Sequence, residues 1–219
     1  AATVYNNRAY VIGGLDKQVG IECQVYTSEN NSWLFEFPSL PKGRFNSVCF
    51  VYRDSLYVFG GTDNSSNMNE IVRYDLSTQN SGEWTTIAKV NEANQRGGVA
   101  FVVEDKVYAG LGEKSNGIRN GFYVSSDSLT KWELIPSIPA QLGVISSGVY
   151  DEQKKSFFMI DNDGKIWEYN LTTEQWTSRS LWIRMKNYHM FMLDGSIYIL
   201  GQDIYQKNKF TVYNPIWDN

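Results

Sequence analysis

The chain has 219 residues, of which 42% are hydrophobic, 15% aromatic and 20% charged, and its formal net charge is −4. No apolar run approaches the length of a membrane-spanning helix, and a pI near 5.1 without a basic cluster argues against nucleic-acid binding. A single histidine, His189, and two cysteines, Cys23 and Cys49, exclude zinc fingers and multi-histidine metal sites. We therefore expect no metal and no cofactor.

One pattern recurs five times along the chain: a polar turn, an aromatic residue, a hydrophobic run, glycines and then an acid. It returns about every 40 to 50 residues, a period that indicates a repeat architecture. The fourth copy, KKSFFMIDND, is degraded. The aromatic residues are Tyr10, Tyr57, Tyr108, Phe157 and Tyr198, and the acids are Asp16, Asp63, Glu113, Asp163 and Asp203.

Two further segments accompany each copy. An apolar strand precedes it, joined by a tight turn such as Asn6-Asn7, Arg53-Asp54 or Asp194-Gly195, which is typical of β-hairpins. A strand with an aromatic residue and then a tryptophan follows it, except in the fifth copy, where Trp217 comes too early. The pairs are Tyr26 with Trp33, Tyr74 with Trp84, Tyr123 with Trp132, and Tyr169 with Trp176.

Each repeat thus predicts three or four short antiparallel strands. A four-stranded sheet cannot bury both of its faces alone, so repeated sheets pack face to face, and radial repetition gives an all-β β-propeller. We expect aromatic side chains to fill the gaps between the blades.

The repeat resembles the kelch repeat, in which a hydrophobic run ends in Gly-Gly and a spaced Tyr and Trp follow. The resemblance rests on Gly13-Gly14, on Gly60-Gly61, on the pairs Tyr26/Trp33 and Tyr169/Trp176, and on the opening arginines Arg44, Arg96 and Arg184. It covers essentially the whole chain and implies a fold similar to those of galactose oxidase and N-acetylneuraminate epimerase. Units three, four and five depart from the Gly-Gly pattern. The single histidine excludes a copper site like that of galactose oxidase.

This resemblance implies one propeller domain over residues 1–219, with blades at about 1–41, 42–93, 94–140, 141–181 and 182–219. The fifth blade lacks a convincing outer strand. Kelch rings usually have six or seven blades, so we expect the chain to be part of a longer protein, although a five-bladed ring stays open.

The five acids follow the second strand of each repeat, which places them on one rim. Each acid can accept N–H bonds from its own loop, as Asp commonly does in turns. The alternative is a ring of carboxylates that attracts a cation or a basic partner.

Three arginines stand at the start of their repeats on the same rim: Arg44, Arg96 and Arg184. They can pair with a neighbouring loop acid or carbonyl, or grip an anionic ligand. Arg119 belongs to a polar loop, Glu113–Gly121, and the loop Thr62–Asn69 is its equivalent in the second repeat. Both loops are candidates for recognition surfaces or for plain solvated loops.

Trp182, Trp167 and Tyr205 lie outside the repeat positions. We place Trp182 in the connection between the fourth and fifth blades, where it is either packed or exposed beside Arg184 for stacking on a sugar or a peptide. Tyr205 has a similar place on the rim. His189 is expected to line the channel or to be satisfied locally, and the cysteines are expected to be buried free thiols.

The favoured function is a non-catalytic binding module that presents rim loops to a protein or a glycan. The alternative is an enzyme acting on acidic sugars, similar to the sialic acid epimerase, which would need a carboxylate or histidine near an arginine. Composition and the segment YVSSDSLTKW, which resembles segments of secreted kelch-like proteins of Bacteroidetes, favour export to the periplasm or cell surface. A lipid anchor before Ala1 and a cytoplasmic location stay open.

Overall fold

The computed structural model describes residues 1–78, 80–117, 119–182, 185–203 and 205–213. The chain divides into two compact units, Ala1–Leu134 and Ile135–Asn219. Its regular elements in these ranges are β-strands and two short 3-10 helices, η1 (Leu76–Thr78) and η2 (Asn91–Ala93). Neither helix has the length and apolarity needed to cross a bilayer, and no other helix is present in the described ranges.

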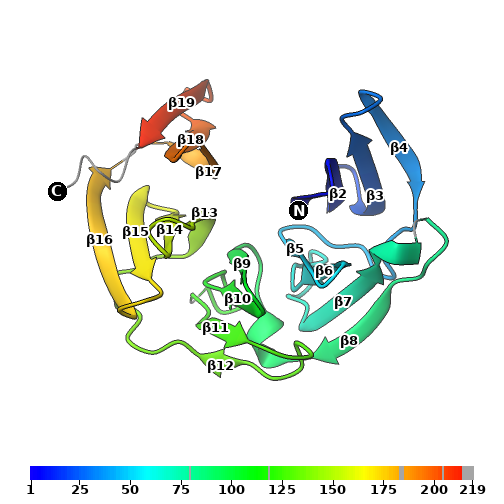
Figure 1. Ribbon diagram of the computed structural model, residues 1–219, viewed down its shortest axis with the longest axis horizontal. Helices are drawn as coiled ribbons and strands as arrows, with labels where there is room; N and C mark the ends of the chain where they lie inside the picture. The colour runs from blue at the N-terminus through cyan, green and yellow to red at the C-terminus, as the bar shows by residue number, and fades with distance from the viewer. Residues whose placement is uncertain (79, 118, 183–184, 204, 214–219) are drawn as a thin grey trace. The chain divides into compact units, whose positions relative to one another are not determined.

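The first unit contains three four-stranded antiparallel sheets, and Figure 1 shows the strands of each sheet side by side in chain order. The first sheet is β1 (Ala2–Tyr5), β2 (Arg8–Leu15), β3 (Val19–Thr27) and β4 (Ser32–Phe37). The second is β5 (Val48–Tyr52), β6 (Ser55–Phe59), β7 (Glu70–Asp75) and β8 (Thr85–Lys89). The third is β9 (Val99–Val103), β10 (Lys106–Gly110), β11 (Phe122–Ser125) and β12 (Glu133–Leu134). Each sheet falls within one predicted blade.

The predicted hairpin turns are confirmed. Asn6 and Asn7 join β1 to β2 with φ angles of 47° and 57°, and Arg53 and Asp54 join β5 to β6 with φ angles of 46° and 54°. Two consecutive residues with positive φ give the turn whose twist matches that of paired strands. Asparagine and aspartate tolerate this conformation, so the local sequence sets the register of each hairpin.

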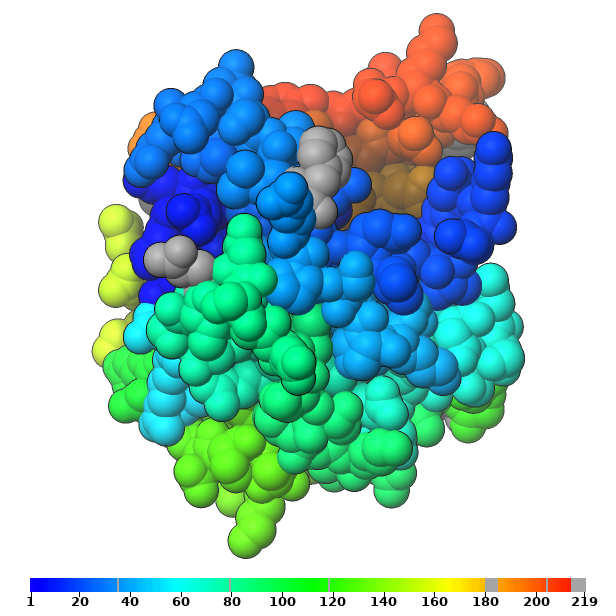
Figure 2. Space-filling model, turned by 90° about the vertical axis from the view of Figure 1, so that its right-hand side faces the viewer, coloured from blue at the N-terminus to red at the C-terminus, as the bar shows by residue number. Residues whose placement is uncertain are grey.

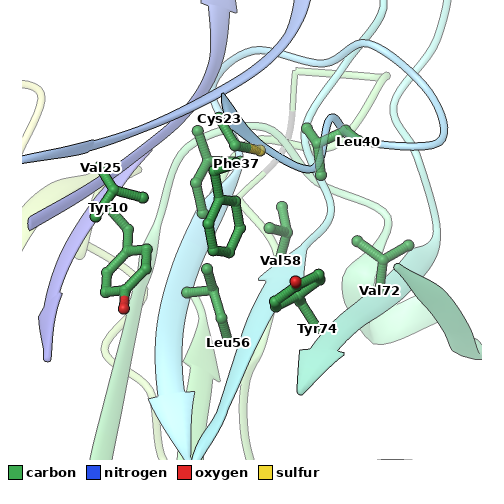
Figure 3. Close-up of a cluster of buried hydrophobic side chains, with 10 residues drawn as sticks. Tyr10, Cys23, Val25, Phe37, Leu40, Leu56, Val58, Val72 and Tyr74 are labelled. Carbon is green, nitrogen blue, oxygen red and sulfur yellow. The ribbon is translucent and has the colours of Figure 1, made fainter. Parts of the chain in front are cut away.

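The hydrophobic core of the first unit lies between consecutive sheets. Tyr10 and Phe37 of the first sheet pack against Leu56 and Tyr74 of the second, as Figure 3 shows. The ring centroids of Phe37 and Tyr74 are 4.6 Å apart. Because successive side chains of a strand point to opposite faces, each sheet can offer one apolar face to each neighbour. The predicted filling of the gaps by aromatic side chains is confirmed here.

Tryptophans beside the last strand join a sheet to the one before it. The Trp84 indole N–H donates to the Pro38 carbonyl at 2.9 Å, and Figure 2 shows the residues after β4 lying against β8. The Trp132 ring lies 5.3 Å from that of Phe59 in the second sheet. Three of the predicted Tyr–Trp pairs are also in ring contact: Tyr26–Trp33 at 5.4 Å, Tyr74–Trp84 at 5.4 Å and Tyr169–Trp176 at 4.8 Å.

The second unit contains two antiparallel sheets. The first is β13 (Ile145–Asp151), β14 (Ser156–Asp161), β15 (Lys165–Asn170) and β16 (Gln175–Trp182), and the second is β17 (Lys186–Leu193), β18 (Ser196–Gln202) and β19 (Asn208–Tyr213). Phe158 and Ile166 pack against Tyr188 and Ile197 between them. The last sheet has three described strands, and the residues after Tyr213, where an outer strand was in doubt, lie outside the described part.

The predicted place of Trp182 is wrong. β16 runs to Trp182, whose backbone pairs with Lys165, so Trp182 ends the fourth sheet and does not lie in a connection. Between Lys165 and Trp167 the register shifts, so that β16 has more residues than β15 over this stretch. The prediction of an all-β chain built from about five propeller-type blades is confirmed.

Candidate functional site

Two loops at one edge of the first unit form the candidate site, and we call them the rim loops: residues 60–69 between β6 and β7, and residues 111–121 between β10 and β11. Gly60 shows why the first loop needs glycine. Its φ is 64°, and a Cβ there would lie 2.5 Å from the Ala93 carbonyl and 2.8 Å from the Gln95 carbonyl. Glycine lets the loop approach the next sheet closely.

Asp63 organises the first rim loop. Its carboxylate accepts hydrogen bonds from the Ser65 amide at 3.0 Å, the Ser65 hydroxyl at 2.6 Å and the Ser66 amide at 3.1 Å. The Lys42 ammonium lies 2.7 Å away. Lys42, Ser65 and Ser66 together hold the pKa of Asp63 well below its usual range. The carboxylate is therefore engaged in hydrogen bonds within its own loop and in an ion pair with Lys42.

Glu113 and Arg96 form a two-pronged ion pair on the second rim loop. The Arg96 Nη2 and Nε atoms donate to the two Glu113 carboxylate oxygens at 2.8 and 3.2 Å. This pair raises the pKa of Arg96. The backbone bridge Arg96–Glu113 matches the bridge Phe45–Thr62 in the second sheet. Glu113 thus occupies the position of Thr62, and its predicted equivalence to Asp63 is wrong by one residue.

A side chain ties the two rim loops together. The Asn67 amide Nδ2 donates to the Glu113 carbonyl at 2.9 Å. Within each loop a bridge closes the base, Thr62–Asn67 in one and Glu113–Arg119 in the other. Arg119 also donates to the Asn120 carbonyl at 3.1 Å, and burial lowers the pKa of its guanidinium. The loops therefore form one connected surface.

Two fully buried amides, Gln95 and Asn120, support the second rim loop. Asn120 Nδ2 donates to the Glu92 carbonyl at 2.7 Å and to Gln95 Oε1 at 3.0 Å. Asn120 Oδ1 accepts from the Gly121 amide at 2.9 Å, and Gln95 Oε1 accepts from the Gly112 amide at 3.1 Å. Sequence reasoning missed both residues. The only signal was an Asn and a Gln beside glycines in a loop.

Arg44 is fully buried and takes the first of the two roles predicted for it, pairing with a neighbouring loop carbonyl and an acid. It donates to the Gly60 carbonyl at 3.1 Å and lies 3.4 Å from the Glu70 carboxylate. Burial lowers the pKa of Arg44, and Glu70 opposes that shift. The Arg44 and Gln95 carbonyls accept equivalent amide bonds from the glycine loops, so Arg44 corresponds to Gln95 rather than to Arg96.

Asp16 is exposed in the loop between β2 and β3 and lines an open cavity of about 610 Å³ with Glu22. Its amide donates to the Gln18 carbonyl at 3.3 Å. Among the described residues, its carboxylate makes no hydrogen bond or ion pair.

In the second unit Asp161, rather than the predicted Asp163, organises the loop of the fourth repeat. The buried Asp161 carboxylate accepts from the Asp163 amide at 3.1 Å, the Lys165 amide at 2.9 Å and the Trp167 indole at 2.9 Å. Trp167 is therefore a packed residue.

The fifth repeat follows the same plan. Asp203 accepts from the amides of Tyr205 and Lys207, both at 2.9 Å, and these bonds together with Lys209 lower its pKa, with the Lys207 amide contributing most. Tyr205 is largely exposed on this loop.

The remaining candidates divide into three groups. Arg184 and the side chain of Trp182 lie outside the described residues. His189 is exposed and lines an open cavity of about 320 Å³ on the last sheet. Cys23 and Cys49 are free thiols, and burial raises the pKa of each to about 12. Among the described residues, no three His, Cys, Asp or Glu side chains gather as metal ligands would.

Comparison with known families assigns the repeat. A family model described as the Kelch motif matches residues 43–91, which hold the second sheet with its glycine pair and Tyr74. This part of the chain therefore carries a Kelch motif. Kelch repeats generally act as protein-interaction modules.

Two kelch proteins of known sequence are similar to this chain. Kelch-like protein 36 of Mus musculus is 26% identical over 161 residues, which cover 68% of this chain and 25% of that protein. Kelch repeat and BTB domain-containing protein 1 of Ectromelia virus (strain Moscow) is 25% identical over 227 residues, covering 98% of this chain and 39% of that protein. The chain thus spans well under half the length of these relatives.

The solved structure of YjhT shares the fold. Its TM-score is 0.78 at 16% sequence identity, and the match covers 97% of this chain and 83% of that chain. This likeness supports the propeller-type blades.

Proposed function

We propose that this kelch-repeat chain is a non-catalytic module that binds a protein partner through the rim loops of its first unit. The proposal rests on one observation above all: the bond from Asn67 to the Glu113 carbonyl joins two polar loops of neighbouring sheets into one surface. A surface that is ordered before binding loses less conformational entropy when a partner docks.

The charges on the rim loops support recognition of a protein of mixed charge. Arg96 and Lys42 are exposed cations, and each lies against an acid of the loops, Glu113 or Asp63. Exposed ion pairs of this kind contribute little to stability. Complementary charges on a partner can instead set the orientation and the rate of association.

The acids of the rim are poor candidates for general acid–base chemistry. A general base works best with a pKa near the operating pH, whereas the hydrogen bonds around Asp63 lower its pKa. Asp203 is lowered in the same direction. This favours binding over the sugar-epimerising alternative. A glycan partner, export and an origin in Bacteroidetes stay predictions.

Affinity capture with matched variants tests the proposal. The chain carries a second exposed ion pair, Arg53 with Asp105, at the hairpin end of the sheets. We expect Arg96→Ala to lose at least one protein that both the parent chain and Arg53→Ala retain, and titration of that purified protein should show weaker binding to Arg96→Ala alone. Equal retention of every captured protein by both variants would show that the rim loops are not the binding surface.

A further inference from the structure

The second rim loop contains the only two Asn-Gly dipeptides of the sequence, Asn116-Gly117 and Asn120-Gly121. An asparagine side chain is most open to attack by the next main-chain nitrogen when that residue is glycine, because glycine has no Cβ to obstruct the approach. The two dipeptides are chemically alike and belong to the same loop. Any difference in their reactivity therefore comes from the fold.

Asn120-Gly121 is protected from this attack. Asn120 is fully buried. Its Nδ2 donates to the Glu92 carbonyl and to Gln95 Oε1, and its Oδ1 accepts from the Gly121 amide and, at 3.3 Å, from the Tyr123 hydroxyl. The attacking N–H is thus itself engaged, and ammonia can leave only if two buried hydrogen bonds break. A Cβ on Gly121 would lie 2.7 Å from the Tyr123 ring, so the backbone has little room to rearrange.

Asn116-Gly117 lies in the opposite environment, at the exposed tip of the loop. Both residues are exposed, as is Ser115 before them. The Gly117 amide donates to the Lys114 carbonyl at 2.9 Å, and this bond at a loop tip opens at little cost because water replaces the partner. Among the described residues beyond its chain neighbours, a Cβ on Gly117 would meet only Glu113 Oε1, at 4.0 Å. The dipeptide has the space that ring closure needs.

We propose that Asn116 is a site of spontaneous deamidation, which converts this part of the rim loops from an amide to a carboxylate. The Gly117 nitrogen bonds to Cγ of Asn116, its proton goes to the departing amide nitrogen, and ammonia leaves behind a succinimide ring. Water then opens the ring at either carbonyl carbon. Opening at Cγ gives aspartate, whereas opening at the main-chain carbonyl gives isoaspartate, whose backbone runs through the β-carbon. One water is consumed and one ammonia is released.

The reaction changes the charge of the binding surface, and this consequence rests on the proposed function. Three cations and one acid belong to the second rim loop or pair with it: Arg96, Lys114, Arg119 and Glu113. A carboxylate at position 116 adds a second acid near Glu113. A partner that needs Arg96 presents a hydrogen-bond acceptor or an acid to that cation, so the added negative charge slows its association.

Peptide mapping by mass spectrometry tests the reaction without any partner. Trypsin cleaves after Lys114 and Arg119, so the two asparagines fall on separate peptides. After the folded chain is incubated at mildly alkaline pH, the Asn116 peptide should gain about 1 Da. It should do so at least about tenfold faster than the Asn120 peptide, because Asn120 reacts only after local opening. In guanidinium chloride, which removes the buried hydrogen bonds, the two rates should become similar.

Two results of the mapping would overturn the proposal. One is equal rates at Asn116 and Asn120 in the folded chain, because the fold would then not select the site. The other is an Asn116 peptide that stays unmodified in the folded chain while both peptides react in guanidinium chloride, because the loop tip would then protect its own dipeptide.

Matched variants test the consequence for binding. Asn116→Asp carries the product charge from the start, whereas Asn116→Gln keeps an amide, and its longer side chain would have to close a larger ring. A purified partner that Arg96→Ala loses should associate with Asn116→Asp at least about threefold more slowly than with Asn116→Gln. Equal association would overturn the effect of deamidation on binding. If Arg96→Ala loses no partner, the proposed function fails, and the mapping still decides whether Asn116 is the modification site.

Discussion

Asn120→Ala is expected to destabilise the first unit through the second rim loop. Asn120 is fully buried, and its side chain donates to the Glu92 carbonyl and accepts from the Gly121 amide. The substitution leaves both of these main-chain groups without that partner, whereas Gln95 keeps its bond from Gly112. A stranded buried polar group costs about 1–3 kcal/mol, so two such groups lower the free energy of unfolding by about 3 kcal/mol.

Urea unfolding followed by tryptophan fluorescence measures this loss. With a slope of about 3 kcal/mol per molar urea, the midpoint should fall by about 1 M. Ser115→Ala is the matched control, because Ser115 lies exposed in the same loop, and its midpoint should stay within about 0.2 M of the parent. An Asn120→Ala midpoint as close to the parent as that of Ser115→Ala would refute the reasoning, because it would show that water or a rearranged loop replaces the amide without cost.

Three further predictions follow from buried or hydrogen-bonded groups. Arg44→Ala leaves the Gly60 carbonyl without its partner and opens a cavity at a fully buried position, so it should lower the free energy of unfolding by about 3 kcal/mol in the same urea assay; an unchanged midpoint would contradict it. The pKa of Asp203 lies below its unfolded value of about 3.9, chiefly through the Lys207 amide, so its stabilising effect is complete above about pH 4 and is lost as the pH falls further. The melting temperature of the parent should therefore fall more steeply between about pH 4 and pH 2 than that of Asp203→Asn, and parallel curves would argue against this. Cys23 and Cys49, with pKa values of about 12, should react with a thiol reagent at about pH 8 only after unfolding; rapid labelling of the folded chain would show that they are accessible.

The blades were predictable because their determinants are local. Asn6-Asn7 and Arg53-Asp54 adopt positive φ angles that few residues tolerate, so each hairpin is marked by its own turn. The Tyr26–Trp33 pair was predictable because the two residues face each other across one strand pair. Period and turn chemistry together place four of the five sheets within their predicted spans, and the fourth runs one residue past its own.

The roles of the rim side chains could not be predicted, because they depend on the conformation of each loop and not on the repeat pattern. Glu113 lies one residue out of register with Asp63, yet both follow a hydrophobic strand and a glycine-containing turn. Asp161 takes the role expected of Asp163, because its carboxylate reaches the Lys165 amide and the Trp167 indole at once. An offset of one or two residues cannot be detected in a repeat pattern, but it determines which carboxylate is buried.

The same slip separates Arg44 from Arg96. Both open a repeat, and a pattern search aligns them. The structure buries Arg44 at the position of Gln95 and exposes Arg96 one residue further on. Whether a guanidinium faces solvent or a carbonyl depends on contacts with the next sheet, and those contacts come from residues far away in the sequence.

Because the hydrophobic core lies between consecutive sheets, each sheet of the first unit is stabilised mainly by the sheets directly beside it. Phe37 and Tyr74 stabilise each other across a boundary, as Phe59 and Trp132 do across the next. The free energy of such an array is a sum of weak single-sheet terms and strong interfacial ones. Removing the middle sheet would therefore forfeit two interfaces, and removing an end sheet only one. Hydrogen exchange should accordingly be slowest in β6 and β7 of the middle sheet.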